Sequence, residues 1–251
     1  MYRETSRDLV SAAQLASDSV VVDLCCGTGI TTEAALEQQG PAGRVIGIDG
    51  SAAMLGQAQS HVVDSRVDFV HAPAEELRSV LDKPVDAVVC NSAIWQTDLQ
   101  IVTAAVAASL RPGGTFTFTV GRRFLIMPFT PEELAPRQPG LSDLATAIAI
   151  LEHDFVPSFG APRGPRRPPL TLDGIDATLR EAGLTPAEPQ TVEYTVTPAQ
   201  QRAWLSIPVF SEQTPGRTYE EKMQILDAAF GRMDQSRTES ARWLIFKATK
   251  P

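Results

Sequence analysis

Short runs of β-branched and aliphatic residues alternate along the first half of the chain with longer stretches whose apolar residues recur at helical spacing. Strands are predicted from residue 20 and at residues 44–49, 67–71, 85–90 and 115–120. Helices are predicted at residues 1–16, from residue 31 to about residue 40, from residue 51, and at 99–110. Alternation of strand and helix patterns predicts an α/β fold, a doubly wound and mostly parallel sheet.

The pattern changes after residue 120. Residues 121–170 contain many prolines and paired arginines, with one predicted helix at 142–151. Their length and irregularity predict a lid inserted over the strand ends. The remaining predicted elements are helices at 171–182, 198–206 and 218–234 and strands at 191–196 and 242–248. The sheet is therefore predicted to contain seven strands.

Composition narrows the class of protein. The chain has 251 residues, of which 43% are hydrophobic and 21% charged, as in ordinary globular proteins. The net charge of −8 disfavours a nucleic-acid partner. Apolar runs are too short to span a membrane and no signal peptide opens the chain, so we expect a cytoplasmic location without a membrane partner. The three cysteines lack zinc-site spacing; we expect small buried residues and no metal.

The segment from Val20 to Gly29 runs from β-branched residues through an acid into a Gly-x-Gly turn. Glycines there let the backbone bend and let a ligand approach it closely. Asp23 could accept hydrogen bonds from a cationic or hydroxylated ligand, and Asp49 ends the second strand, where an acid can bind both ribose hydroxyls of a nucleotide-like cofactor. The dinucleotide fingerprint fails, because Thr32 stands where glycine or alanine is required.

These residues resemble the class I S-adenosylmethionine-dependent methyltransferases, in the style of the ubiquinone- and menaquinone-biosynthesis enzymes and their small-molecule relatives. The resemblance covers roughly residues 10–120 and rests on five segments in family order: 23–29, 47–49, 74–77, 85–91 and 110–114. It implies a Rossmann-like sheet whose last strand is antiparallel. It also implies three regions: an S-adenosylmethionine-binding core (1–120), the lid (121–170), and the rest of the sheet with additional substrate-side helices (171–251).

S-adenosylmethionine is the cofactor that the resemblance implies, with S-adenosylhomocysteine as its product. The implied cofactor-binding residues are Asp23, Cys25, Gly27, Thr28, Gly29, Asp49, Gly50, Met54, Ala74, Glu75 and Asn91. Met54 fits the position beside adenine, although a plain core methionine fits nearly as well. Pro73 replaces the acid that usually takes the adenine amino hydrogen, so adenine would depend on the backbone amide of Ala74 and on apolar packing.

The acceptor pocket is predicted beyond the fourth strand and in the lid, because ligands bind outside the carboxyl ends of parallel strands. Its predicted residues are Trp95, Gln96, Phe124 and Phe155. Methyl transfer depends on alignment, and a base is useful only where the nucleophile holds a proton. His153, next to Asp154, is the candidate catalytic base, with a surface histidine as the alternative. The lid arginines could bind an anionic substrate group or simply be solvated.

The sequence thus predicts methyl transfer from S-adenosylmethionine to a small, fairly apolar metabolite, for example in specialised metabolism. Two alternatives stay open: an enzyme of the same fold that catalyses cyclisation or another non-methylating step, and a non-catalytic cofactor-binding partner subunit. A nucleic-acid methyltransferase is disfavoured, because Asn91-Ser92-Ala93-Ile94 replaces the Asn/Asp-Pro-Pro-aromatic tetrad. We expect a monomer or homodimer, and the acceptor atom, oxygen, nitrogen or carbon, is left open.

Overall fold

The computed structural model describes residues 2–127, 170–207 and 218–251. These residues belong to two compact units. The larger unit contains residues 2–127, 170–192 and 242–251, and the described part of the smaller one contains residues 193–207 and 218–241. Most of the predicted lid, residues 128–169, lies outside the described residues.

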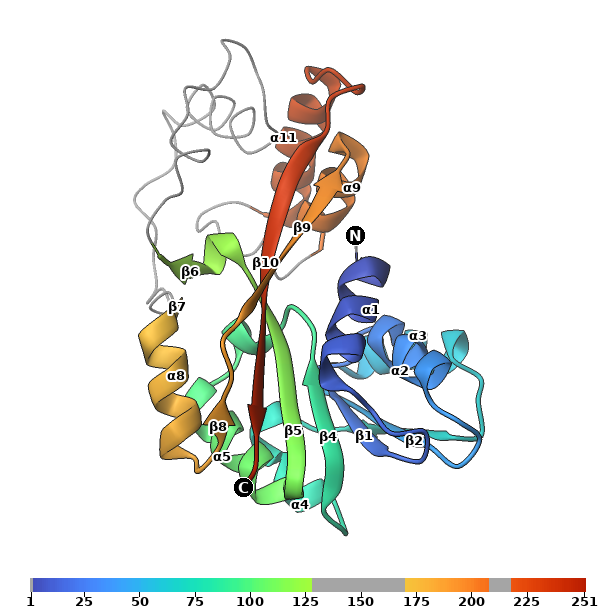
Figure 1. Ribbon diagram of the computed structural model, residues 1–251. Coiled ribbons are helices and arrows are strands. Elements are labelled where there is room, and N and C mark those ends of the chain that lie inside the picture. The colour runs from blue at the N-terminus through green and yellow to red at the C-terminus, as the bar shows by residue number, and fades with distance from the viewer. Residues whose placement is uncertain (1, 128–169, 208–217) are drawn as a thin grey trace. The chain divides into compact units, whose positions relative to one another are not determined.

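A mixed sheet forms the centre of the larger unit (Figure 1). Its strands are β1 (Val20–Leu24), β2 (Arg44–Asp49), β3 (Val67–His71), β4 (Val85–Cys90), β5 (Leu110–Gly121), β8 (Thr185–Pro186), β9 (Gln190–Val196) and β10 (Glu239–Thr249). The order is β3-β2-β1-β4-β5-β10-β8, and β9 also pairs with β10. Strands β1 to β5 pair in parallel, whereas β10 is antiparallel to β5 and β8. The predicted fold class is therefore confirmed, including the antiparallel last strand.

Two details of the sheet differ from the predicted elements. The sheet has eight strands where seven were predicted, because the two-residue strand β8 pairs with the end of β10. Strand β5 begins at Leu110 and includes residues 111–114, which were predicted to be only a turn. The turn is accommodated within the strand by two features, a register shift between Val85 and Ala87 and the left-handed conformation of Gly113 (φ 75°).

Helices cover both faces of this sheet. Helices α1 (Tyr2–Ala13), α2 (Ile30–Gln38) and α3 (Ala52–His61) lie on one face, where Leu9, Val10 and Ala35 are buried. Helices α4 (Leu77–Val80), α5 (Leu99–Ser109) and α8 (Leu172–Glu181) lie on the other. There, Phe116 and Phe118 alternate with polar residues along β5 and enter the main hydrophobic core. Apolar burial on both faces is what holds a parallel sheet together.

The smaller unit contains α9 (Pro198–Leu205) and α11 (Tyr219–Gly231). Each helix begins with a capping box, at Thr197 and Thr218 respectively. Its small core consists of Ile225, Leu226, Ala229 and Met233, packed by Leu205, Met223 and Phe230. Two short strands of the larger unit, β6 (Leu125–Ile126) and β7 (Leu170–Thr171), form a separate parallel pair.

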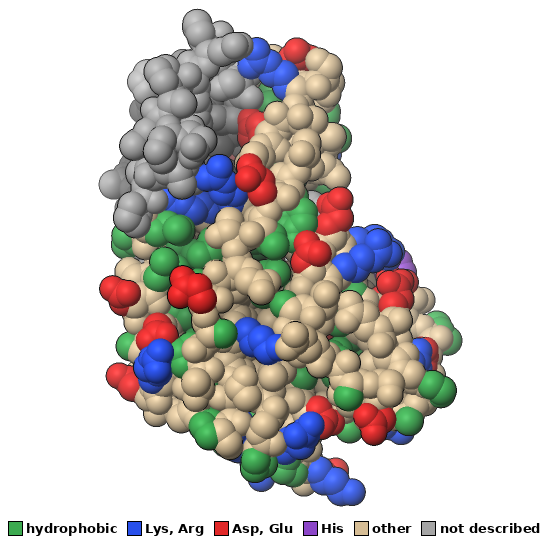
Figure 2. Space-filling view, viewed as in Figure 1, with side chains coloured by type: hydrophobic (Ala, Val, Ile, Leu, Met, Phe, Trp, Pro, Cys, Tyr) green, Lys and Arg blue, Asp and Glu red, His purple; other side chains and the backbone are tan. Residues whose placement is uncertain are grey.

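Surface charge on the larger unit is mixed. Acidic and basic side chains are interspersed over the described part of the face in Figure 2. Across residues 2–127, 170–207 and 218–251, every helix is too short or too polar to cross a membrane.

Candidate functional site

The loop between β1 and α2 has an unusual backbone. Cys25, Gly27 and Gly29 all have left-handed conformations, with φ angles of 58°, 56° and 86°. The loop is held in place because the amide of Cys26 donates to the carbonyl of Ile48 at 3.0 Å, and the amide of Gly29 donates to Cys26 at 3.0 Å. The structure thus contains the turn that the Gly-x-Gly pattern predicted, and the approach of a ligand to its backbone at the start of α2 stays a prediction.

Asp49 connects this loop to the next one. One oxygen, Oδ2, accepts the amide hydrogen of Gly27 at 2.8 Å, and the other, Oδ1, accepts that of Ser51 at 2.8 Å. Each oxygen of a carboxylate has two lone pairs, so both can still accept a hydroxyl donor. The Asp49 carboxylate, which is predicted to bind the ribose hydroxyls, is therefore held in a fixed orientation by backbone donors from two different loops.

Asp23 is almost completely buried, with 1% of its surface exposed. Its Oδ2 accepts the hydroxyl hydrogen of Thr32 at 2.6 Å, while its buried Oδ1 has no hydrogen-bond partner among the described residues. Burial raises the pKa of Asp23 from 3.8 to about 7; the nearby charge of Asp49 adds to the rise and the Thr32 bond opposes it. An unpartnered, buried carboxylate oxygen is a strong acceptor for a cationic donor.

No described lysine or arginine forms an ion pair with Asp23 or Asp49. The site therefore combines two carboxyl groups, a left-handed loop and a helix start without any cationic side chain paired to the acids. A ligand carrying positive charge fits this arrangement, because it would favour the ionised form of Asp23.

Asn91 forms hydrogen bonds with residues of both α1 and β5. Its amide donates to the hydroxyls of Thr5 and Ser6 on α1, at 3.1 and 2.9 Å. Its carbonyl oxygen accepts from Thr119 on β5 at 2.7 Å and from Ser92 at 3.3 Å. Both donors and both lone pairs of the side chain are thus used within the protein. Asn91 links α1 to the ends of β4 and β5, and its predicted contact with the cofactor stays a prediction.

The candidate adenine side lies after β2 and β3. Gly50 precedes α3 and Met54 lies in its first turn, where the hydroxyl of Ser51 accepts the amide hydrogen of Met54 at 3.4 Å. Ala74 is buried in a short 3₁₀ helix, η1 (Ala74–Glu76). The Glu75 carboxylate accepts the amide hydrogen of Asp98 at 3.0 Å, which occupies one of its oxygens with the loop before α5.

The predicted acceptor pocket is described in part. Trp95, in η2 (Ile94–Gln96), and Phe124, in η3 (Arg122–Phe124), stack with ring centroids 4.2 Å apart and an interplanar angle of 7°. Trp95 also donates its indole hydrogen to the carbonyl of Ser92 at 3.0 Å. Gln96 is half-buried beside it. His153 and Phe155 lie outside the described residues, as do the arginines at 163, 166 and 167.

Several hydroxyl residues of the site were missed at the level of sequence. Thr32, in the first turn of α2, donates a hydrogen bond to Asp23. Thr119 donates to Asn91 and accepts the amide hydrogen of Ser92 at 2.7 Å. Ser6 also bonds to Thr31, at 2.9 Å. The available signal was the presence of hydroxyls inside otherwise apolar runs, since a buried hydroxyl requires a partner.

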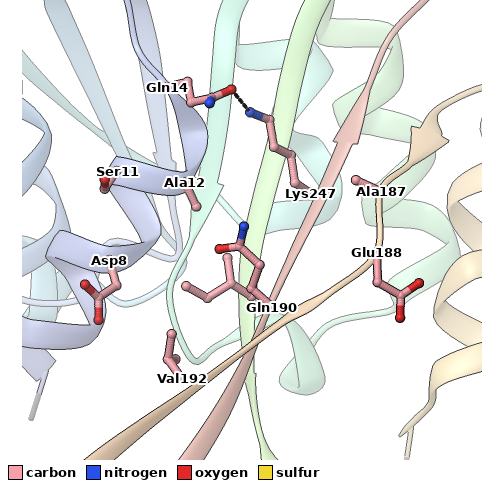
Figure 3. Close-up of a pocket in the computed structure, with 10 residues that line it drawn as sticks. Asp8, Ser11, Ala12, Gln14, Ala187, Glu188, Gln190, Val192 and Lys247 are labelled. Atoms are coloured by element: carbon pink, nitrogen blue, oxygen red, sulfur yellow. Dashed lines mark hydrogen bonds between the residues drawn. The ribbon is translucent and has the colours of Figure 1, made fainter.

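A separate pocket of about 480 Å³ lies between α1 and the strands β9 and β10 (Figure 3). Lys247 points into it and donates to the side-chain oxygen of Gln14 at 2.7 Å, and burial lowers the pKa of Lys247. None of the predicted site residues lines this pocket. Among the described residues, no group of three or more metal-binding side chains is arranged to hold a metal ion.

Comparison with known proteins identifies relatives of the larger unit. Residues 21–114 match a family model described as a methyltransferase domain. The chain is 33% identical over 153 residues to trans-aconitate 2-methyltransferase of Azoarcus sp., covering 58% of this chain and 56% of that protein. It is 36% identical over 108 residues to ubiquinone biosynthesis O-methyltransferase of Aromatoleum aromaticum, covering 41% and 45%. The matches thus span less than two thirds of these relatives.

Solved structures share the fold at low sequence identity. The YcgJ protein of Bacillus subtilis has a TM-score of 0.60 at 18% identity, with 98% of each chain covered. The [4+2]-cyclase SpnF has a TM-score of 0.58 at 16% identity, with 98% of this chain and 80% of that chain covered. At such identities the likeness establishes the fold alone.

Proposed function

Because residues 21–114 form a methyltransferase domain of the class I, S-adenosylmethionine-dependent family, we propose that the chain transfers a methyl group from S-adenosylmethionine to a small, fairly apolar metabolite. The observation that carries this proposal is the unpartnered, buried oxygen of Asp23 beside the Gly27–Gly29 loop and the Asp49 carboxylate. These groups offer acceptors and no paired cation, which suits a cofactor that is itself positively charged.

S-adenosylmethionine, when bound, supplies a methyl group on a cationic sulfonium and also carries an ammonium, a ribose and an adenine. In our proposal the free lone pairs of Asp49 accept the ribose hydroxyls, while its backbone partners Gly27 and Ser51 hold the carboxylate still. The buried oxygen of Asp23 accepts from the cationic end of the ligand. Met54 and Ala74 flank adenine, with Gly50, Thr28 and Cys25 completing the walls.

The acceptor would lie against the Trp95–Phe124 stack, with Gln96 and Phe155 as further pocket residues. A flat apolar wall suits an apolar acceptor and supplies alignment, which can account for much of the rate enhancement of a displacement reaction. His153 is proposed as a base where the acceptor holds a proton.

Binding of the cofactor is tested by titration calorimetry on the full chain. We expect S-adenosylmethionine and S-adenosylhomocysteine to bind and NAD to give no heat of binding. Binding of NAD without a response to either sulfur compound would overturn the proposal.

Positioning and base catalysis can be separated once an acceptor is found. We expect Trp95→Ala to lower turnover by about a hundredfold, because a misaligned acceptor loses near-attack geometry. Trp95→Phe, which keeps an aromatic ring against Phe124, is the matched control. If His153→Ala instead costs two to four orders of magnitude, as loss of a general base does, and Trp95→Ala is almost silent, the chemistry depends on the base.

A non-methylating reaction is the second candidate, because the fold is shared with a protein described as a [4+2]-cyclase. The two are distinguished by product analysis with metabolite extracts. Methyl transfer forms one S-adenosylhomocysteine for each methylated product, whereas a cyclase forms no S-adenosylhomocysteine. We further propose a small-molecule substrate, a monomer or homodimer, and a cytoplasmic location, without a nucleic-acid or membrane partner.

A further inference from the structure

Two cysteines lie at the point where the strand order reverses. Strand β1 pairs with β2 on one side and with β4 on the other. The strands that follow β1 extend the sheet in one direction, to β2 and β3, and β4 and β5 extend it in the opposite direction. Cys25 follows β1 and Cys90 is the last residue of β4. In open α/β sheets the ligand crevice opens at the carboxyl ends of these two strands. The two thiols therefore lie at the crevice in which we propose that the cofactor binds.

The two cysteines lie in one apolar cluster. Cys25 packs against the buried cluster that contains Cys90, and the Cys25 side chain is the largest cause of the raised pKa of the Cys90 thiol. Asp23 on β1 is opposite Val89 on β4, so this register places Cys90 opposite Leu24, the residue before Cys25. Neighbouring strands are about 4.8 Å apart, and disulfides join Cα atoms that are roughly 4.4–6.8 Å apart. A bond between the two sulfurs is thus compatible with the strand spacing.

Access to the two sulfurs is unequal. Cys25 is half-buried, whereas Cys90 is completely buried. The neighbouring Cys25 side chain, together with burial, raises the pKa of the Cys90 thiol, which keeps Cys90 protonated. An oxidant arriving from solvent therefore meets Cys25 first. Cys90 is then held next to the oxidised sulfur, where proximity compensates for its weak nucleophilicity.

We propose that Cys25 and Cys90 form a reversible disulfide that closes the cofactor crevice, with Cys25 as the site of first attack on a hydroperoxide. In the first step the Cys25 thiolate attacks a peroxide oxygen; a sulfur–oxygen bond forms, the oxygen–oxygen bond breaks, and the released hydroxide takes up a proton. In the second step the Cys90 sulfur attacks the Cys25 sulfenic acid; the disulfide forms and a second water leaves. Two thiols thus reduce one hydrogen peroxide to two waters.

Formation of the disulfide and binding of the cofactor are expected to weaken each other. Bonding requires the sulfurs to come within about 2.05 Å, which ties the β1–α2 loop to the end of β4. A ligand lying in the crevice between them would cover Cys25. Because linkage is reciprocal, a ligand that hinders the disulfide must itself bind less well to the disulfide form. This last effect rests on the proposed function, whereas formation of the bond does not.

The chain offers a matched control in Cys26. Cys26 is adjacent to Cys25 in sequence and is buried, as Cys90 is. Its sulfur, however, lies next to β2, where a Cβ added to Gly47 would be 3.2 Å from it. Cys26→Ala should therefore leave the disulfide intact, while Cys25→Ser and Cys90→Ser should abolish it. Thermal unfolding of each reduced variant establishes that it is folded.

The test treats the full chain with hydrogen peroxide, alkylates the remaining thiols, and maps disulfides by peptide mass spectrometry. We expect a Cys25–Cys90 linked peptide that dithiothreitol removes, and a dimedone-trapped sulfenic acid at Cys25 in Cys90→Ser. S-adenosylhomocysteine at ten times its dissociation constant should slow alkylation of Cys25 about tenfold, by mass action. The oxidised form should bind S-adenosylhomocysteine about tenfold or more weakly than the reduced form.

A Cys25–Cys26 disulfide would contradict the proposed bond between Cys25 and Cys90. Irreversible oxidation of Cys25 while Cys90 stays reduced would contradict it as well. A linked form that binds S-adenosylhomocysteine as tightly as the reduced form would overturn the closure of the crevice. If neither sulfur nucleoside binds the reduced chain, the proposed function fails, while a Cys25–Cys90 bond detected in the same samples would stand by itself.

Discussion

At the scale of the residue, Asp23 is the clearest conflict between stability and a binding role. A carboxyl group with one buried oxygen unpartnered is costly to ionise. Its pKa of about 7 lies above the ordinary value of 3.8, so the folded chain holds a proton between these pH values that the unfolded chain has lost. The free energy of unfolding therefore falls as pH rises from about 4 to 7, and the full penalty remains at higher pH.

Asp23→Asn tests this dependence. The change in pKa from 3.8 to about 7 corresponds to roughly 4 kcal/mol between protonation states. We expect the wild type to lose stability relative to Asp23→Asn between pH 5 and pH 8, measured by urea unfolding. S-adenosylhomocysteine, whose ammonium can pair with the carboxylate, should recover part of the loss at pH 8. Parallel stability curves for the two proteins would show that the buried carboxyl does not titrate in this range.

Asp49 and Glu75 are two acids with different predicted weight in cofactor binding. Asp49 is oriented by two backbone donors and retains lone pairs for two hydroxyls, whereas one oxygen of Glu75 is already engaged by Asp98. We expect Asp49→Asn to weaken S-adenosylhomocysteine binding by about 1.5–3 kcal/mol for each charge-assisted hydrogen bond lost. Glu75→Gln is the matched control, and calorimetry should find it weakened much less. Equal dissociation constants would contradict the assignment of the ribose to Asp49.

At the scale of the element, α1 is docked through hydroxyl groups as well as apolar packing. Ser6 is fully buried and lies between Asn91, which directly follows β4, and Thr31 on α2. Leu9 and Val10 on the same helix enter the core, so the helix has both an apolar and a polar attachment to the sheet. The polar attachment sets the position of α1 relative to the candidate cofactor loop.

Ser6→Ala should loosen this attachment. It leaves an amide hydrogen of Asn91 and the hydroxyl of Thr31 short of a partner in a buried site, which costs about 1–3 kcal/mol. Hydrogen exchange should accelerate in α1, while α5 on the opposite face keeps its protection. Ser60→Ala is the matched control, because it removes an exposed hydroxyl that bonds only within α3. Similar exchange in both variants would mean that apolar packing alone holds α1.

The elements that sequence reasoning could predict are those with a local signature. The turn at Gly27 and Gly29 could be predicted because strand, turn and helix signals are adjacent in the sequence there. Asp49 could be predicted in the same way, because it ends the next strand pattern. The bonds of Asn91 could not be predicted, since they join residues 85 and 86 positions apart. Strand β8, two residues long, has no periodicity to detect. The stack of Trp95 on Phe124 likewise depends on tertiary structure.

At the scale of the whole molecule, the candidate cofactor residues and the helices α9 and α11 belong to different units. Residues 23–91 lie in the larger unit, while α9 and α11 form the smaller one around its own core. Strands β9 and β10 each pass from one unit into the other. A cofactor held only by residues of the larger unit is therefore expected to protect that unit and not α9 and α11.

Hydrogen exchange with the cofactor product alone tests this division. A ligand at a hundred times its dissociation constant adds about 2.7 kcal/mol to any opening that destroys its site. We expect S-adenosylhomocysteine to slow exchange in the β1–α2 and β2–α3 loops. Amides of α11 that exchange through opening of the smaller unit should be unchanged, because that opening leaves Asp23 and Asp49 in place. Equal protection of α11 would mean that the two units open together.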